Sequence, residues 1–209
     1  LGSAETTLLQ ITNAYSTFVN GGKKINPILI QRIQDRRGKT IALSDKRKCT
    51  TCQSKSGWEG QLPPEIRDNR KSITDPSSAY QMTSILKGVV DRGTGIKLKK
   101  LNINLAGKTG TTNDNTNAWF IGFSPDIVVG VYIGYDEPKP LGKRETGSSA
   151  AVPIFEYFFK EYSKNKPDIP FRRPRGIRLI PIHVKNGMRA NEIKEGVIQE
   201  AFKSGQFPE

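Results

Sequence analysis

A run of four residues, Lys108-Thr109-Gly110-Thr111, combines a cation, two hydroxyl groups and a position without a side chain. The run falls within residues 105–112, whose composition predicts a β-strand. On an edge strand, the ammonium and hydroxyl groups could bind a carboxylate. The glycine would let the backbone of a substrate approach closely. These residues are therefore the first candidates for a binding or catalytic site.

A phosphate-binding loop is the competing interpretation, because Gly107-Lys108-Thr109 matches the end of that motif. The spacing argues against it. The first glycine of such a loop would occupy position 102, which is Asn102, and the residues that follow continue as a strand instead of opening a helix. On the triplet alone, an ordinary strand with a turn glycine also stays open.

Two Ser-x-x-Lys spacings could supply a serine nucleophile beside an amine, at Ser84 to Lys87 and at Ser163 to Lys166. Ser84 lies about 200° around a predicted helix from the apolar Met82, which predicts a solvent-facing position. Ser163 follows the motif strand and ends a predicted surface helix. Roughly one such spacing is expected by chance in a chain of this composition, so neither match establishes a nucleophile.

Three helices are predicted around the motif. Thr7 and Gln10 form a capping box that opens the first. Asp75 followed by proline opens the second, which ends near Gly93. The third, over residues 149–162, is rich in aromatic residues. The second helix carries an apolar stripe formed by Met82, Ile85, Leu86 and Val89.

The β-like runs predict an antiparallel meander over residues 105–112, 118–123 and 127–135. Helices against an antiparallel sheet make the fold class α+β. Residues 27–43 and residues 177–187 each predict a further hairpin, the second with its turn at Asn-Gly.

Four stretches of sequence carry a family resemblance: LGSAETTLLQITNAYSTFVNGG, MTSILKGVVDRGTG, GKTGTTNDNTNAWFIGFSPDIVVGVYIGYD and GSSAAVPIFEYFFKEY. In this order, over roughly residues 1–165, they resemble the transpeptidase domain of class A penicillin-binding proteins, the bifunctional peptidoglycan synthases. The resemblance implies the C-terminal part of a penicillin-binding/beta-lactamase-like transpeptidase fold with a small C-terminal appendage. A beta-lactamase is the nearest related interpretation, but residues 15–22 and 92–95 are unlike a compact hydrolase.

The activity that the resemblance implies is that of a serine-type D,D-transpeptidase or carboxypeptidase, which needs no cofactor. In this family a serine is acylated by the D-alanyl-D-alanine end of a peptidoglycan stem peptide, and beta-lactams mimic that end. By resemblance, Thr109 and Thr111 bind the terminal carboxylate, and Lys108 supplies positive potential and assists the proton relay. The N–H of Thr111 forms half of an oxyanion hole, and Gly110 keeps the approach open.

One departure concerns the family's other motifs, S-x-x-K and S-x-N, which precede the K-T-G strand. Here they do not appear in that form, so we expect them N-terminal to Leu1, in a remainder of the same protein. A membrane anchor and the glycosyltransferase domain are expected there too. The family implies the periplasmic face of the bacterial inner membrane.

The expected organisation places the C-terminal portion of the transpeptidase domain at residues 1–165, with a polar insertion near 44–72. Residues 166–209 form a basic, Pro-rich linker and tail. The formal net charge of +13 leaves an alternative, a non-catalytic basic module that binds an anionic polymer or nucleic acid. Its contacts would come from the cations Lys97, Lys99, Lys100, Arg172, Arg173 and Arg175. The resemblance favours the enzyme, without specific binding of nucleic acid.

Cys49 and Cys52 lie in a polar stretch and are candidates for a local disulfide in an oxidising compartment. A structural zinc site is not expected, because His183 is the single histidine and lies far away in the sequence. The surroundings also lack the strand-then-helix pattern of a thioredoxin-like site. No metal site is predicted. The sequence contains no run of about 18 apolar residues, so it predicts no membrane span.

Overall fold

The computed structural model describes residues 5–47, 66 and 68–208. The chain divides into two units, residues 1–24 with 72–209 and residues 25–71, and each is described by itself. The predicted disulfide of Cys49 and Cys52 lies outside the described residues.

The larger unit contains the three predicted helices, α1 (Leu8–Val19), α2 (Pro76–Arg92) and α3 (Val152–Tyr162). The capping box of α1 is confirmed: Thr7 Oγ1 accepts from the Gln10 N–H at 3.2 Å, and the Thr7 N–H donates to Gln10 Oε1 at 3.0 Å. Asp75 caps α2, whose last turn ends at Gly93 as predicted. A 3₁₀ helix (Ile96–Leu101) follows α2, and a π-helical turn (Gly147–Ala151) leads into α3.

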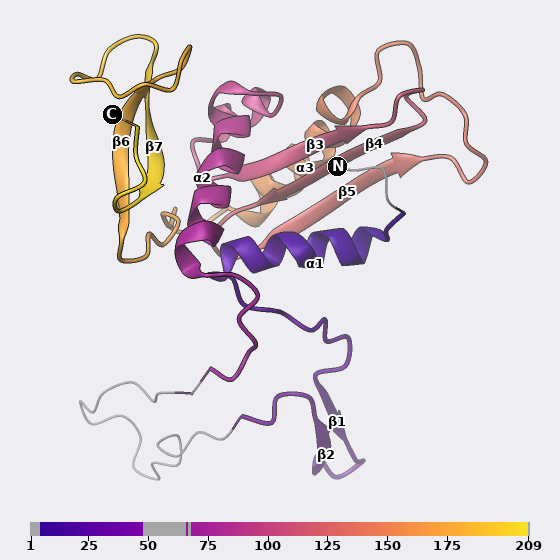
Figure 1. Ribbon diagram of the computed structural model, residues 1–209. Helices are drawn as coiled ribbons and strands as arrows, with labels where there is room; N and C mark the ends of the chain where they lie inside the picture. The colour runs from indigo at the N-terminus through magenta and orange to yellow at the C-terminus, as the bar shows by residue number, and fades with distance from the viewer. Residues whose placement is uncertain (1–4, 48–65, 67, 209) are drawn as a thin grey trace. The chain divides into compact units, whose positions relative to one another are not determined.

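The predicted meander is confirmed as an antiparallel sheet of β3 (Ala106–Thr111), β4 (Asn117–Phe123) and β5 (Val128–Gly134), in that spatial order (Figure 1). The register places Ala106 opposite Phe123 and Thr111 opposite Ala118. Successive side chains alternate between the two faces of the sheet, so each face builds its own part of the core.

One face of the sheet packs against α3. Phe120 of β4 meets Phe155 of α3 edge to face, with ring centroids 4.9 Å apart, and Phe155 stacks on Phe159 at 5.2 Å. All three rings are buried. Such aromatic pairs contribute about 0.5–1.5 kcal/mol beyond the burial of their area. Residues that lie directly opposite each other in an antiparallel pair share a face of the sheet. Thr109 lies opposite Phe120, so the side chains of Thr109 and Thr111 lie on the same face of the sheet as this aromatic cluster.

The other face carries α1. Tyr15 of α1 packs edge to face on Phe123, with centroids 6.4 Å apart. A Cβ on Gly130 of β5 would collide with α1 side chains, among them Leu8, so glycine allows the helix to lie close to the sheet. Within α1, which the structure describes in full, no residue is buried.

α2 crosses beside β3 and contributes to both halves of the core. Leu86 packs with Ala106 and Phe123, whereas Val90 joins the cluster of Phe120 and Phe155. The predicted apolar stripe of α2 is covered only in part. Leu86 is buried, but Met82 and Ile85 are 39% and 55% exposed.

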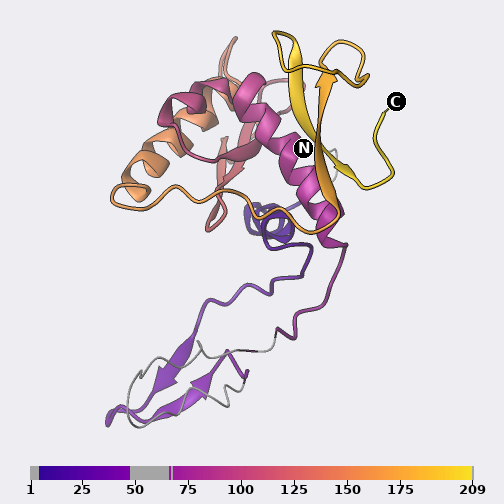
Figure 2. The same ribbon diagram turned by 90° about the vertical axis from the view of Figure 1, so that its left-hand side faces the viewer.

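The tail forms a hairpin of β6 (Ile177–His183) and β7 (Val197–Lys203), which lies beside α2 (Figure 2). The Asn186-Gly187 turn exists, since the Gly187 N–H donates to the His183 carbonyl at 2.8 Å. The small hairpin predicted at this turn is confirmed, because the His183 N–H donates to the Met188 carbonyl and the Ala190 N–H to the Pro181 carbonyl, both at 2.9 Å. The sequence did not predict that β6 also pairs over its whole length with the later strand β7. Ala201 on β7 accepts a hydrogen bond from Gln81 of α2 at 3.1 Å, which fixes β7 against the helix.

The smaller unit contains the other predicted hairpin, β1 (Arg32–Gln34) and β2 (Thr40–Leu43). Gly38 adopts a φ of +80° in its turn, a conformation that glycine reaches at little cost. Every residue of both strands is exposed.

Across the described ranges, no helix combines the length and the apolar character needed to cross a membrane.

Candidate functional site

The four motif residues lie on β3, as predicted. Among the residues that the structure describes, no strand pairs with the other side of β3, which we call the open edge. Thr111 is exposed and Lys108 is half-buried, whereas Thr109 is 8% exposed and Gly110 is buried. The motif therefore lies at an edge of the sheet, with its most exposed hydroxyl at the end of the strand.

Backbone pairing shows which groups point to the open edge. In an antiparallel pair, alternate residues of a strand exchange hydrogen bonds with the neighbouring strand. Immediately after β3, the Thr112 N–H donates to the Asn117 carbonyl at 3.2 Å. The alternation therefore directs the N–H and C=O groups of Thr109 and Thr111 away from β4. These groups are available to a molecule that adds to the open edge.

The Lys108 ammonium lies at the same edge, because Nζ donates to the Thr109 carbonyl at 2.8 Å. None of the ion pairs between described residues involves Lys108. Its positive charge is thus not neutralised by a carboxylate in this part of the chain, and it can attract an anion.

The Thr111 hydroxyl oxygen accepts a hydrogen bond from the Gly147 N–H at 3.0 Å. Gly147 opens the π-helical turn and lies directly over the backbone of β3. A Cβ at this position would lie 2.5 Å from the Trp119 carbonyl oxygen and 2.7 Å from that of Gly110. Any side chain here would therefore push the Gly147 N–H away from the Thr111 hydroxyl. The contact also covers one side of Gly110, so a substrate backbone would approach from the open edge.

The Thr109 hydroxyl lies 2.7 Å from the hydroxyl of Thr94, in the turn between α2 and the 3₁₀ helix. The Thr94 carbonyl in turn accepts from Ser148 Oγ at 2.7 Å. Sequence reasoning missed Thr94, Gly147 and Ser148. The flanking glycines of Thr94 and the Gly-Ser-Ser run were visible signals, but neither indicates a contact with β3.

The two Ser-x-x-Lys spacings do not form nucleophile and base pairs. Ser84 Oγ donates to Glu200 Oε1 at 2.6 Å, and Lys87 forms an ion pair with Asp91 at 3.5 Å. The expectation that Ser84 faces solvent was wrong, because β7 packs on that side of α2 and leaves it half-buried. At the second spacing, Lys166 Nζ lies over the Tyr162 ring, 3.3 Å from its centroid.

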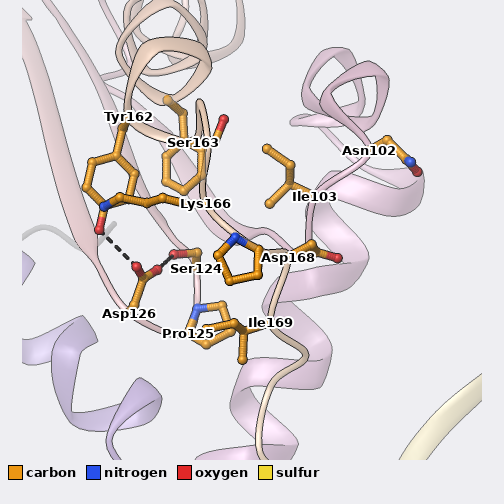
Figure 3. A pocket seen from close by; sticks show the side chains of 12 residues that line it. Asn102, Ile103, Ser124, Pro125, Asp126, Tyr162, Ser163, Lys166, Asp168 and Ile169 are labelled. Atoms are coloured by element: carbon orange, nitrogen blue, oxygen red, sulfur yellow. Dashed lines mark hydrogen bonds between the residues drawn. The ribbon is translucent and has the colours of Figure 1, made fainter.

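A pocket of about 240 Å³ lies near the β4–β5 turn and the end of α3 (Figure 3). There Asp126 accepts hydrogen bonds from Ser124 and, at 2.9 Å, from Tyr162. Both hydrogen bonds lower the pKa of Asp126, and the one from Ser124 has the larger effect. No motif residue lines this pocket, which lies toward the beginning of β3, beside Asn102. Nowhere in the described ranges do three metal-ligating side chains gather.

Comparison with known proteins identifies the family of the chain. A family model described as the penicillin binding protein transpeptidase domain matches residues 2–160. The penicillin-binding protein 1A of Rickettsia bellii is 47% identical over 97% of this chain and 25% of its own length. That of Neisseria gonorrhoeae is 37% identical over 85% of this chain and 20% of its own length. The chain thus spans about a quarter of the length of the curated relatives it matches.

Solved structures share the fold. The penicillin-binding protein 1A of Haemophilus influenzae matches all of this chain and 33% of its own, with a TM-score of 0.80 and 27% identity. The ceftriaxone acyl-enzyme of penicillin-binding protein A from Mycobacterium tuberculosis matches 77% of this chain and 33% of its own, with a TM-score of 0.55 and 19% identity. The predicted α+β fold and family resemblance are confirmed, whereas the alternative of a basic binding module gains no support.

Proposed function

The chain belongs to the penicillin-binding protein transpeptidase family, and from this premise we propose that it forms the K-T-G side of a D,D-transpeptidase active site. The reaction is a serine acyl transfer that crosslinks peptidoglycan stem peptides, and beta-lactams acylate the same serine. Hydrolysis of the acyl-enzyme by water would give the carboxypeptidase reaction. The observation that carries the proposal is the open edge of β3, where an ammonium group, a hydroxyl group and an outward N–H lie together.

In this proposal the open edge receives the C-terminal end of a stem peptide as an added strand. The hydroxyls of Thr109 and Thr111 bind its terminal carboxylate by charge-assisted hydrogen bonds. Thr111 is suited to donate, since its oxygen already accepts from Gly147 and its hydrogen has no acceptor within the described ranges. Gly110 adds no side chain that would obstruct the peptide.

The outward N–H of Thr111 stabilises the oxyanion that develops on the scissile carbonyl. A second N–H, that of the nucleophilic serine, would complete the oxyanion hole. Lys108 supplies positive potential near the carboxylate and the reacting hydroxyl, and it assists proton transfer in the relay.

The nucleophile and the S-x-N motif are proposed to come from a segment that precedes this chain in a longer protein. The geometry of Ser84 and Ser163 supports this, because Ser84 binds Glu200 and Lys166 lies over Tyr162. The relatives, about four times as long as the region they share with this chain, leave room for that segment, for a glycosyltransferase domain and for a membrane anchor. Stem peptides as substrates would place the site on the periplasmic face of the inner membrane.

The test is the rate at which benzylpenicillin acylates the full-length protein that contains this chain. Lys108→Ala should lower the second-order acylation rate constant by about 100-fold or more, because both the positive potential and the proton relay are lost. The melting temperature should stay close to that of the wild type, since the one hydrogen bond that the Lys108 ammonium makes to a described residue is to its neighbour, Thr109.

Lys87→Ala is the matched control, because it removes a lysine at the Ser84 Ser-x-x-Lys spacing whose partner is an exposed carboxylate of the same helix. Its acylation rate should equal that of the wild type. Equal rates for Lys108→Ala and the wild type, or no acylation of the wild type at all, would contradict the proposed function.

A further inference from the structure

We propose that Thr94 is a positioning residue for acylation, one that orients the Thr109 hydroxyl to donate to the substrate carboxylate. The inference rests on the proposed function of the β3 edge and adds a residue outside the K-T-G motif. Its basis is the 2.7 Å contact between the Thr94 and Thr109 hydroxyls, which joins residues 15 positions apart.

The backbone of Thr94 is held on both sides. The N–H groups of Gly93 and Gly95 both donate to the Val89 carbonyl, at 3.2 and 2.9 Å, and so fold the turn back onto the end of α2. Ser148 Oγ donates to the Thr94 carbonyl at 2.7 Å. Thr94 is therefore tied to the end of α2 and to the π-helical turn, which limits the directions its hydroxyl can take.

The direction of the hydrogen bond between Thr94 and Thr109 decides whether Thr109 can donate to a substrate. A hydroxyl group has one hydrogen to donate and two lone pairs that accept. A carboxylate only accepts, so Thr109 must donate its hydrogen to a bound carboxylate. The contact with Thr94 can then persist only if Thr94 donates to Thr109. A donated hydrogen bond polarises the Thr109 hydroxyl and strengthens the bond that it makes to the anion.

The second motif hydroxyl is held in the same way. The Gly147 N–H donates to the Thr111 oxygen, so that hydroxyl also accepts from the protein and can donate outward. The short segment Gly147-Ser148 therefore acts on both motif hydroxyls. Gly147 binds Thr111 directly, and Ser148 binds Thr94, which contacts Thr109. A pair of hydroxyl donors fixed in advance loses less entropy on binding a carboxylate than freely rotating ones.

The test compares two probes on the full-length protein, benzylpenicillin and its methyl ester, which lacks the carboxylate charge. Thr94→Val keeps the shape of the side chain and removes the donor. It should lower the acylation rate constant for benzylpenicillin by about fivefold to tenfold, the scale of one hydrogen bond. The slower reaction of the ester should change by less than about twofold, because a neutral acceptor gains less from a polarised donor. Thr94→Ser, which restores a hydroxyl, should recover most of the rate.

Thr116→Val is the matched control. It breaks another contact between threonine hydroxyls, the 2.9 Å pair of Thr112 and Thr116, in the turn after β3. Its rates with both probes should equal those of the wild type. Equal losses for Thr94→Val with the acid and the ester, or no loss with either, would overturn the role of Thr94 while leaving the proposed function intact. A wild-type protein that no penicillin acylates would overturn the proposed function itself.

Discussion

The sheet of β3, β4 and β5 and the hairpin of β1 and β2 are both antiparallel. The backbone pairing is of the same kind in both. Their surroundings differ completely. In β4 five of the seven residues are buried, whereas all residues of β1 and β2 are exposed.

The difference teaches that strand pairing does not by itself make a site. An isolated two-stranded hairpin is marginally stable in water, so its side chains are not held in fixed positions. In the larger sheet the core under Phe120 holds β3, and segments from elsewhere then orient its hydroxyls at distances near 3 Å. A catalytic site needs that precision, since small displacements of reacting groups cost large factors in rate.

The largest effect that tests this comparison is expected at Phe155. Phe155→Ala removes a fully buried ring that contacts Phe120 and Phe159, and it should lower the free energy of unfolding by about 3–5 kcal/mol. Urea unfolding of the full-length protein, followed by near-ultraviolet circular dichroism, would measure it. The acylation rate should fall with the loss of folded protein.

Ile41→Ala in β2 is the matched control, because it shortens an aliphatic side chain that is 68% exposed. Its effect on the free energy of unfolding should stay within about 0.5 kcal/mol. A loss at Ile41 as large as that at Phe155 would show that the hairpin packs against another part of the protein and would break the comparison.

A smaller effect concerns acid stability, which Asp126 in the larger unit should influence and Asp45 in the smaller unit should not. The pKa of Asp126 is lowered by the hydrogen bond from Ser124 and then by that from Tyr162. A carboxyl with a lowered folded pKa adds stability above its unfolded pKa and loses it as the pH falls through the folded value. Tyr162→Phe should therefore reduce stability at neutral pH, and its difference from the wild type should narrow below about pH 4.

Arg47 lowers the pKa of Asp45 to about 2, mainly through a side-chain hydrogen bond. The two residues are two positions apart, so the contact can also form in the unfolded chain and then adds nothing to folding. Melting temperatures measured from about pH 3, below the ordinary pKa of a carboxyl group, up to about pH 7, where such groups are ionised, would check both residues. A pH-independent loss in Tyr162→Phe, or a pH-dependent loss in Arg47→Ala, would contradict this assignment.

Much of the fold could be predicted from local sequence signals. The capping box of Thr7 and Gln10, the cap at Asp75 and the turn at Gly38 are set by neighbouring residues and appear as expected. The position of the motif on a strand also followed from its own composition. The ends of the three predicted strands of the meander differ from those observed by at most one residue, because pairing with the neighbouring strand decides where a strand stops.

The rest depends on contacts between residues far apart in the sequence. Ser84 was placed in solvent because helical periodicity does not show that β7 packs on that side of α2. Thr94 and Gly147 were missed for the same reason, since they meet β3 across 15 and 36 positions. The residue types that contact substrate could be read from the motif, whereas the residues that orient them needed the structure.

The central claim is that the open edge of β3 binds the substrate and that the attacking serine comes from another part of the protein. Mass spectrometry of the full-length protein after reaction with benzylpenicillin tests it most directly. Our account predicts a penicilloyl adduct on a serine that precedes these 209 residues. An adduct on Ser84, on Ser163 or on any other residue of this chain would contradict it.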